Sequence, residues 1–236
     1  DGVEDAVRYY GVRPERARRL PNLADPRQLA ARAAETPSGV DLTEREAPSI
    51  CLVSRLYRRK RVDTLLQAAA ALPNGLPWRI DIVGDGDQTG ILAQMAKDLG
   101  IAERVTLHGW TPNPYPILAR ASVSVLCSEY EGFSNSVLES MLLGVPVVTS
   151  LCTSDAVDMV QKGAALGFPV GDADGLRDRL ASLLTDAALG ATIRETALHY
   201  AKAHELPGAI AAYEKLVVDA IAEARSRRMS RTSATP

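Results

Sequence analysis

From residue 48 onward, short runs of β-branched and other apolar residues alternate with stretches in which apolar residues recur every three or four positions. The short runs predict buried strands, and the other stretches predict amphipathic helices. Strands are predicted at residues 49–53, 79–83, 104–107, 122–126, 146–149 and 165–168. Apolar strands separated by helices indicate a parallel sheet covered on both faces. We therefore expect an α/β domain with a Rossmann-like, doubly wound parallel sheet of about six strands.

The helices between these strands are marked by stripes of apolar side chains. They are predicted around residues 62–69, 92–99, 116–121, 137–142 and 156–162. Gly100 and Gly144 follow two of them, at the position where helices commonly end in a left-handed residue.

Both ends of the chain differ from this alternation. A helix is predicted over residues 2–12, and a helix followed by a loop over 27–47. The last third is rich in alanine and predicts helices at 176–184, 187–203 and 207–224.

Composition restricts the class of protein. The chain has 236 residues, 46% hydrophobic and 24% charged, which is ordinary for a soluble globular protein with a full core. Its net charge of −2 gives no overall attraction to nucleic acid or to an anionic membrane. No apolar stretch approaches the roughly 20 residues of a membrane span, and no signal peptide is recognisable. Cys51, Cys127 and Cys152 form no metal or redox motif, so reduced thiols are expected, which suits the cytoplasm.

Residues 225–236 are rich in arginine and lack apolar periodicity, which predicts a disordered basic tail. Two interpretations of this tail stay open: a solvated segment, which we favour, and a peripheral contact with an anionic membrane surface. A nucleic-acid-binding function would rest only on the tail and on residues 58–61. The slightly acidic net charge and the lack of an aromatic platform argue against it.

In an open parallel sheet, ligands bind beyond the carboxyl ends of the strands. The loop after the first strand has five basic side chains directly before a helix: Arg55, Arg58, Arg59, Lys60 and Arg61. A helix N-terminus favours anions, and arginine can hold two phosphate oxygens at once. The loop therefore predicts a phosphate site, with a solvated basic turn as the alternative.

The next two loops are less specific. Gly84 and Gly86 form a Gly-x-Gly turn, which either lets a ligand approach the backbone or is an ordinary tight turn. Thr89 stands where a dinucleotide fingerprint needs its third glycine, which argues against a nicotinamide dehydrogenase. After the third strand, Trp110 either lines a pocket for a base or packs structurally, and His108 is expected to be structural.

The loop after the fourth strand is richest in candidate chemistry. Glu131 precedes a helix that is predicted to begin at Ser134 or Asn135, and Glu139 lies within that helix. The first-turn amides and Gly132 suit an anion or sugar hydroxyls, and carboxylates accept hydrogen bonds from vicinal hydroxyls. Taken alone, each glutamate is better explained as a solvated surface residue.

Together, these loops resemble the carboxyl-terminal, donor-binding domain of family 4 retaining glycosyltransferases, which have the GT-B fold. That family has a Gly-Arg-Leu-x-x-x-Lys-Gly loop, and this chain has Ser54-Arg55-Leu56 followed by Lys60-Arg61. The Val-Gly-x-Gly turn of the family corresponds to residues 83–86. Its block of two glutamates followed by Gly-x-Pro-Val corresponds to residues 131–147.

The resemblance implies roles for the matching residues. Arg55 and Lys60 would hold the donor diphosphate and offset charge on the departing nucleotide. Glu131 would lie near the donor sugar, Glu139 would bind the ribose hydroxyls, and residues 109–110 would border the base. The implied site has three catalytic residues and nine that bind the donor: Glu131, Arg55 and Lys60; and Ser54, Gly84, Gly109, Trp110, Gly132, Phe133, Ser134, Asn135 and Glu139.

The resemblance also implies the parts of the chain and its ligands. Residues 1–47 would be an N-terminal or interdomain segment, 48–205 the nucleotide-sugar-binding domain, 206–224 a helix crossing toward the other domain, and 225–236 the tail. No metal or cofactor is expected, because cationic side chains offset the charge. The co-substrate would be a nucleotide-diphosphate sugar, a UDP-sugar in preference to a GDP-sugar.

This chain departs from the family pattern at two places. Ser54 and Arg61 stand where the family has glycine, and both are expected to tighten or crowd the phosphate approach. Residues 152–157 replace a Gly-rich turn and a Pro-Glu pair.

Three functions fit these features. The first is a retaining transferase that moves a sugar to a hydroxyl of a glycan or lipid-linked glycan. Its acceptor-binding half would precede Asp1, so we expect the chain alone to bind donor and to transfer little. The second is a non-catalytic nucleotide-sugar-binding subunit that works with a partner chain. The third is an epimerase that forms product from the donor alone.

Overall fold

The computed structural model describes residues 3, 7–8, 11–17, 22–36, 47–202, 210–211 and 213–222. Its centre is one parallel sheet of six strands, so the predicted fold class is confirmed. The strands are β1 (Ser49–Val53), β2 (Arg79–Val83), β3 (Val105–Gly109), β4 (Val123–Leu126), β5 (Val147–Ser150) and β6 (Leu166–Phe168). All six predicted strands are present, with small differences at their ends.

The order of the strands across the sheet is β3-β2-β1-β4-β5-β6, and every neighbouring pair is parallel. This is the doubly wound order in which the winding reverses between the first and the fourth strand. The reversal leaves a crevice beyond the carboxyl ends of β1 and β4, which is the usual ligand position in such sheets.

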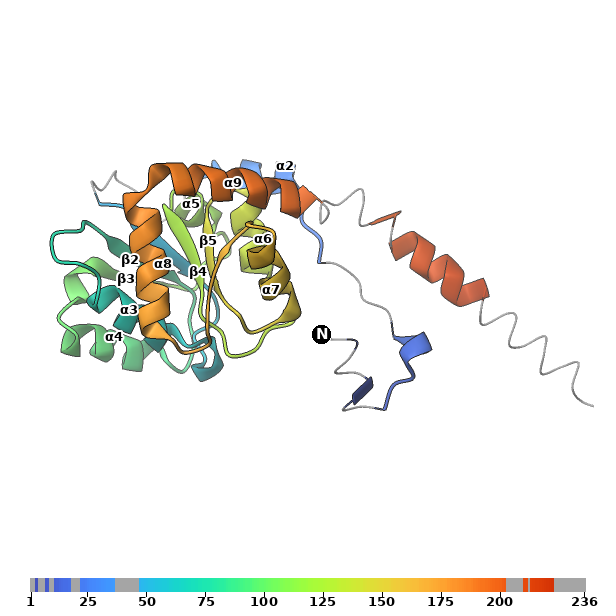
Figure 1. Ribbon diagram of the computed structural model, residues 1–236, viewed down its shortest axis with the longest axis horizontal. Helices are drawn as coiled ribbons and strands as arrows, with labels where there is room; N and C mark the ends of the chain where they lie inside the picture. The colour runs from blue at the N-terminus through green and yellow to red at the C-terminus, as the bar shows by residue number, and fades with distance from the viewer. Residues whose placement is uncertain are drawn as a thin grey trace, which may run out of the picture.

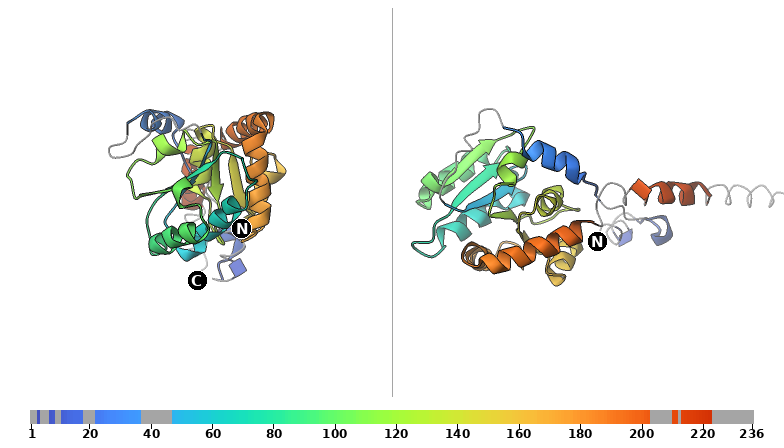
Figure 2. Two further views of the ribbon diagram at one scale, coloured as in Figure 1. Left: turned by 90° about the vertical axis from the view of Figure 1, so that its left-hand side faces the viewer. Right: turned by 90° about the horizontal axis from the view of Figure 1, so that it is seen from above.

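Helices cover both faces of the sheet (Figure 1). They are α2 (Pro26–Ala33), α3 (Val62–Ala70), α4 (Thr89–Asp98), α5 (Tyr115–Leu118), α6 (Asn135–Leu142), α7 (Ser154–Gln161), α8 (Ala173–Thr185) and α9 (Ala187–Ala201), with the short 3-10 helices η1 (Pro14–Arg16), η2 (Arg58–Lys60) and η3 (Ala102–Arg104). On one face lie α3, α4 and α8, and on the other lie α5, α6 and α7. Figure 2 shows α2 and α9 on opposite sides of α6, and both helices contact it.

Alternating strand residues feed the cores on the two faces. Ile50 and Leu52 of β1 pack under α3, whereas Cys51 between them packs under α5. In β4, Val125 joins the first core and Leu126 joins the core under α6, α7 and α9. Both faces of the central strands are therefore buried, which explains why their sequences are apolar almost throughout.

Cysteine burial follows the same pattern. Cys51 and Cys127 are fully buried and free, as predicted, and Cys152 is a partly buried free thiol. Burial strongly raises the pKa of the Cys51 and Cys127 thiols, so both stay neutral.

One charged group lies inside the sheet. The side chain of Asp81 on β2, with the residue only 3% exposed, accepts a 2.5 Å hydrogen bond from the Ser49 hydroxyl. Its other oxygen lies 2.9 Å from Nε2 of His108, and Arg79 is 3.4 Å away. Burial would raise the pKa of Asp81, but these three partners outweigh it and lower that pKa. His108 therefore has the structural role predicted for it.

The predicted terminal elements are only partly described. Positions 3 and 7–8 of the helix predicted at 2–12 are helical, as are 210–211 and 213–222 of the one predicted at 207–224. The helix predicted to begin near residue 27 is α2, which is shorter than the predicted segment, and residues 37–46 lie outside the described residues. The basic tail at 225–236 lies outside them as well.

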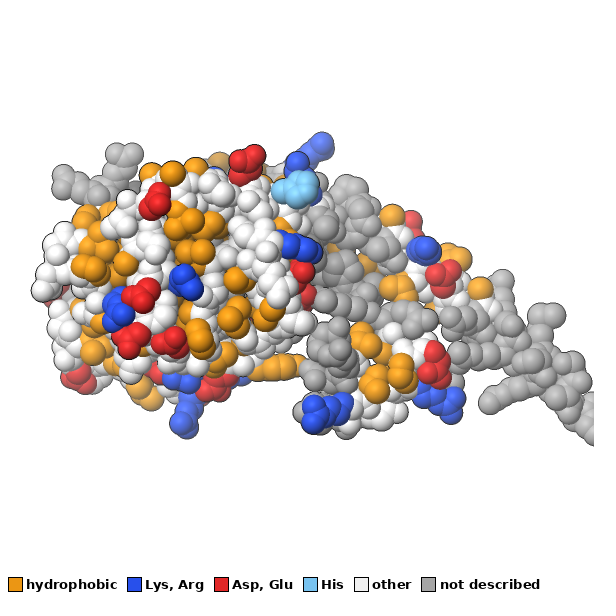
Figure 3. All heavy atoms as spheres, viewed as in Figure 1, with side chains coloured by type: hydrophobic (Ala, Val, Ile, Leu, Met, Phe, Trp, Pro, Cys, Tyr) orange, Lys and Arg blue, Asp and Glu red, His pale blue; other side chains and the backbone are white. Residues whose placement is uncertain are grey.

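Acidic, basic and apolar side chains are interspersed over α8 and α9 in the face shown in Figure 3. Among the described helices, none combines the length and the hydropathy needed to cross a membrane.

Candidate functional site

The loops that follow β1 and β4 meet at the carboxyl edge of the sheet. The amide of Glu129 donates a 2.8 Å hydrogen bond to the carbonyl oxygen of Arg59. Beside this contact, Nζ of Lys60 pairs with Oε1 of Glu131. Two predicted catalytic residues, 71 positions apart in the chain, are thus brought together at the point where the strand order reverses.

The Lys60–Glu131 pair is largely shielded from water, with side-chain exposures of 14% and 13%. A shielded ion pair needs additional hydrogen bonds to offset the cost of desolvation. The Ser128 hydroxyl supplies one, 2.6 Å from the same oxygen of Glu131. Glu131 is therefore fixed from two sides, by the β1–α3 loop and by its own loop.

Three other basic residues of this loop are exposed. Within the described part of the chain, the guanidinium groups of Arg55, Arg58 and Arg59 make no ion pair. They form a local positive surface next to a lysine whose charge is already balanced. Such a surface attracts anions without having first to release an internal partner.

Glu139 belongs to a separate network. Its carboxylate accepts a 3.0 Å hydrogen bond from the hydroxyl of Tyr115 on α5. The Arg32 guanidinium of α2 stacks over the Tyr115 ring at 4.7 Å. Burial raises the pKa of Glu139, against the lowering effects of Tyr115 and Arg32. Glu139 shares no hydrogen-bonding partner with Glu131 among the described residues, since Glu131 contacts Lys60 and Ser128.

The N-cap side chain of α6 does not cap the helix. Ser134 is its N-cap residue, as predicted, but its hydroxyl lies 3.1 Å from the Ser136 hydroxyl and caps no amide. A Cβ added at Gly132 would meet no atom within 4 Å. The loop therefore faces open space next to a helix N-terminus, an arrangement suited to an anion or hydroxyl ligand.

Asn22, in the segment before α2, fixes the loop at the start of α6. Nδ2 of Asn22 donates to the carbonyl oxygen of Phe133 at 3.0 Å and to Oδ1 of Asn135 at 2.7 Å. Both predicted donor-binding residues are thus tied to the chain that precedes α2.

Gly84 has a structural reason to be glycine. Its φ is +132°, and a Cβ there would lie 1.8 Å from the carbonyl oxygen of Ser54. The amide of Ser54 donates to the carbonyl of Val83 at 3.0 Å, so the loops after β1 and β2 lie directly against each other. The close approach that this glycine permits is between two loops of the protein. Donor binding by Gly84 and Ser54 remains a prediction.

Trp110 is 74% exposed, so the packing role that we considered for it is wrong. The preceding residue, Gly109, has a φ of +70°, and its carbonyl oxygen accepts a 2.8 Å hydrogen bond from the amide of Gly84. An exposed aromatic side chain on the carboxyl edge is available to a ligand, and the predicted contact with a base remains untested.

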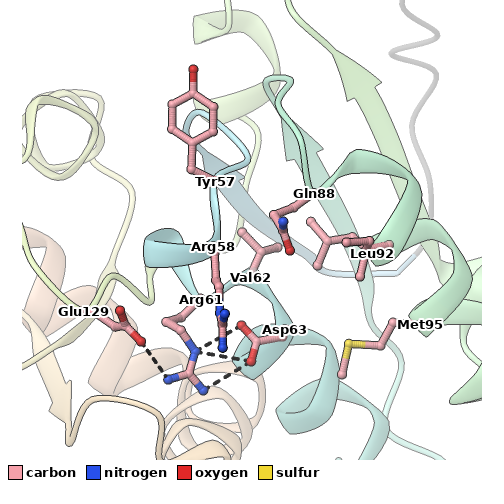
Figure 4. Close-up of a pocket in the computed structure, with 10 residues that line it drawn as sticks. Tyr57, Arg58, Arg61, Val62, Asp63, Gln88, Leu92, Met95 and Glu129 are labelled. Carbon is pink, nitrogen blue, oxygen red and sulfur yellow. Dashed lines mark hydrogen bonds and ion pairs between the residues drawn. The ribbon is translucent and has the colours of Figure 1, made fainter.

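A pocket of about 350 Å³ lies beside the basic loop, between η2, the start of α3 and α4 (Figure 4). It is lined by Tyr57, Arg58, Arg61, Val62, Asp63, Gln88, Ile91, Leu92, Met95 and Glu129. None of the twelve residues predicted for the site is in this lining. The basic residues 58–61 predicted a phosphate site near this pocket. No feature of the sequence predicted the pocket itself.

The departure at residues 152–157 produces an ordinary helix start. The hydroxyl of Thr153 accepts a 3.1 Å hydrogen bond from the amide of Ala156 and caps α7. Burial raises the pKa of the neighbouring Cys152 thiol, and the charge of Glu131 adds to that effect.

Four contributors were missed in the sequence: Asn22, Arg32, Tyr115 and Ser128. The first three act through tertiary contacts, whereas Ser128 acts on Glu131 three positions further along the chain. In the described part of the chain, no three His, Cys, Asp or Glu side chains gather in a metal-binding group. The expectation of a metal-independent site stays a prediction.

Comparison with known proteins gives consistent matches. The family model described as glycosyl transferases group 1 matches residues 47–186, more than half of the chain. A lipopolysaccharide core biosynthesis glycosyltransferase of Rhizobium meliloti, LpsE, is 32% identical over 153 residues, covering 65% of this chain and 44% of that protein. A lipopolysaccharide 1,6-galactosyltransferase of Salmonella typhimurium is 33% identical over 127 residues, covering 51% and 35%.

Solved structures show the same fold. The crystal structure of Anabaena HepE in complex with UDP-glucose has a TM-score of 0.73 at 21% identity, covering 90% of this chain and 59% of that one. The chain thus spans less than half the length of the two curated relatives and under two thirds of this structure.

Proposed function

The chain belongs to the glycosyl transferases group 1 family, and on that premise we propose that it is the donor-binding domain of a retaining glycosyltransferase. It binds a nucleotide-diphosphate sugar, and the sugar passes to a hydroxyl acceptor. The observation that carries this proposal is the Lys60–Glu131 pair at the reversal of the strand order. The shielded ammonium group of Lys60 would offset the charge of the donor diphosphate, and the carboxylate of Glu131 would lie near the donor sugar.

The donor diphosphate would be held from two directions. Arg55 and Lys60 approach it from the β1–α3 loop, and the amides of residues 132–134 approach it from the start of α6. Support comes from the guanidinium of Arg55, which makes no ion pair with another described residue, from an N-cap side chain that does not cap α6 and from the open space at Gly132.

The nucleoside would lie toward α5. Glu139, held by Tyr115, accepts hydrogen bonds from the ribose hydroxyls, and the exposed Trp110 borders the base. UDP is the favoured nucleotide, because a structure of the same fold is described in complex with UDP-glucose.

The chemistry follows from these charges. The bond between the anomeric carbon and the diphosphate oxygen breaks, and negative charge develops on the diphosphate while the carbon becomes oxocarbenium-like. The acceptor hydroxyl attacks that carbon from the same face and loses its proton. Arg55 and Lys60 stabilise the leaving diphosphate without a metal, and Glu131 faces the positive sugar carbon.

The acceptor would bind to another part of the protein, an amino-terminal half in the same polypeptide or a partner chain. Relatives named for lipopolysaccharide biosynthesis support a glycan or lipid-linked glycan as acceptor. We place the enzyme in the cytoplasm, with peripheral contact to the inner face of the membrane as the alternative. A non-catalytic subunit with the same donor site is the alternative.

Calorimetry with UDP and UDP-glucose tests the proposal, and a thermal-shift comparison with GDP- and ADP-sugars tests the base. Arg55→Ala and Lys60→Ala are each expected to weaken UDP binding by about tenfold or more, because each removes a charge-assisted phosphate contact. The control is Arg177→Ala, which removes an arginine from the exposed surface of α8. Unchanged UDP affinity in both site variants would refute the assignment.

A turnover assay separates the three functions. A transferase forms glycosylated acceptor once the acceptor-binding half is supplied, whereas a non-catalytic subunit binds donor without forming product under the same conditions. Conversion of the donor alone into an epimer identifies the third function.

A further inference from the structure

Arg61 has an unusual backbone conformation. It lies between η2 and α3 with φ 47° and ψ 42°, and it is the one described residue other than glycine with a positive φ. A side chain is disfavoured in this left-handed region, which is why glycine is common there. Such a conformation persists only when surrounding contacts hold it.

Those contacts are made by the guanidinium of Arg61. It binds Asp63 through Nε and Nη2 at 3.2 Å, and Nη1 reaches Oε1 of Glu129 at 3.3 Å (Figure 4). It also lies against Gly171, where a Cβ would come within 3.2 Å of Nη1. One side chain therefore joins the loops that follow β1, β4 and β6.

Three adjacent contacts join the loops that follow β1 and β4. The carbonyl of Arg59 accepts from the amide of Glu129, Lys60 pairs with Glu131, and Arg61 pairs with Glu129. Three consecutive residues of one loop thus hold a three-residue stretch of the other.

We propose that Arg61 is a positioning residue, which holds Glu129 and thereby fixes the distance between Lys60 and the loop of Glu131 to which the donor diphosphate binds. This inference rests on the proposed function. The guanidinium is already occupied by two carboxylates, so Arg61 acts through its neighbours and does not contact the phosphate. It also balances the charges of Asp63 and Glu129, which would otherwise repel an incoming diphosphate.

A chain with glycine at position 61 would keep the backbone turn but lose this connection between the loops. Lys60 would then sample more positions, and part of the binding free energy would be spent on ordering it. Removing the Arg61 guanidinium should therefore weaken donor binding more when Lys60 is present than when it is absent.

A double-mutant cycle with UDP as the probe tests this dependence. Arg61→Asn removes the guanidinium, and asparagine tolerates a positive φ better than most residues, so the variant should fold. In the otherwise unchanged protein, we expect UDP to bind about fivefold more weakly, and in the Lys60→Ala background less than about twofold more weakly. Arg177→Asn, which removes an arginine held by Asp174 and Asp178 on α8, is the matched control and should leave UDP affinity unchanged.

Hydrogen exchange of the amides of residues 128–134 provides a readout that needs no ligand. Arg61→Asn should speed this exchange, whereas Arg177→Asn should not. Unchanged exchange refutes the contact between loops, whatever the outcome with UDP. Faster exchange with an equal loss of affinity in both Lys60 backgrounds refutes the positioning role and makes Arg61 an independent contributor. If Lys60→Ala leaves UDP affinity unchanged, the positioning role fails, and the proposed function fails as well only if Arg55→Ala also leaves it unchanged.

Discussion

The Tyr115 hydroxyl donates a 3.0 Å hydrogen bond to Oε1 of Glu139, and this contact connects the short helix after β3 to the helix after β4. The Arg32 guanidinium of α2 stacks over the Tyr115 ring. Glu139 is thereby held by a helix without charged residues, and its second oxygen makes no hydrogen bond to another described residue.

Tyr115→Phe should weaken UDP binding by about three- to tenfold, because it removes the hydrogen bond that orients Glu139 but keeps the ring beneath Arg32. Calorimetry measures the change. Tyr200→Phe is the matched control, since Tyr200 of α9 makes a 2.9 Å hydrogen bond to the carboxylate of Asp158 away from the site. Equal effects of the two substitutions on UDP affinity would contradict the role assigned to Tyr115.

Glu139→Gln should lower UDP affinity and yet stabilise the fold near pH 7. Burial raises the pKa of Glu139, so its contribution to stability is present below its ordinary pKa and is lost as the pH rises through the folded value. The ionised group therefore destabilises the folded state at neutral pH. We expect a gain of a few tenths of a kcal/mol in the free energy of unfolding at pH 7 and little difference near pH 3.5. Urea unfolding at both pH values measures it, and a loss of stability at pH 7 would be the wrong sign.

Gly84→Ala should lower the stability of the protein, whereas Gly132→Ala should weaken ligand binding with little change in stability. The first places a Cβ against the carbonyl of Ser54 at a positive φ, and should lower the free energy of unfolding by about 2 kcal/mol or more. At Gly132, where φ is not positive and a Cβ meets open space, stability should change by less than about 0.5 kcal/mol. Because that space is where we propose that the donor lies, Gly132→Ala should still weaken UDP-glucose binding. Thermal unfolding and calorimetry on the same samples separate the two effects.

Asp81→Asn should destabilise the protein by about 3 kcal/mol at pH 7, because it removes the buried negative charge that pairs with Arg79 and replaces one of the two acceptor oxygens facing His108 and Ser49 with a donor. The pKa of Asp81 is lowered, so its contribution is present above its ordinary pKa and is lost as the pH falls through the folded value. The difference between the two proteins should therefore shrink below about pH 4. Asp87→Asn, at an exposed position, should unfold like the parent protein throughout.

The strands were predictable because burial on both faces leaves a local signature. β1 reads Ser-Ile-Cys-Leu-Val and is buried over most of its length, so its apolar run has no competing explanation. The helix ends at Gly100 and Gly144 were equally readable, since both have a φ near +70°. The helix predicted at 116–121 is α5, which begins one residue earlier, at Tyr115, and ends three residues earlier, at Leu118, because a single turn of helix has too few residues for a period that would fix its ends.

The site was predictable only as far as local spacing reaches. Lys60 and Glu131 were placed in one site because parallel strands bring their carboxyl ends to one edge. Their direct contact, and the hydrogen bond from Ser128, depend on side-chain directions that no periodicity encodes. The same limit applies to Arg61, which was recognised as a departure from glycine, whereas its contact with Glu129 depends on tertiary structure.

The order of strands also determines when the site can exist during folding. β1 pairs with β4 across 73 positions of the chain, the largest separation among the strand pairs, whereas its other neighbour, β2, is much closer in sequence. Closing a longer loop costs more chain entropy, and contacts between distant residues slow folding. Because Lys60 and Glu131 follow these two strands, they meet only after the most distant pairing in the sheet has formed. Nucleotide binding during refolding should therefore report on the pairing of β1 with β4, which joins the two halves of the sheet.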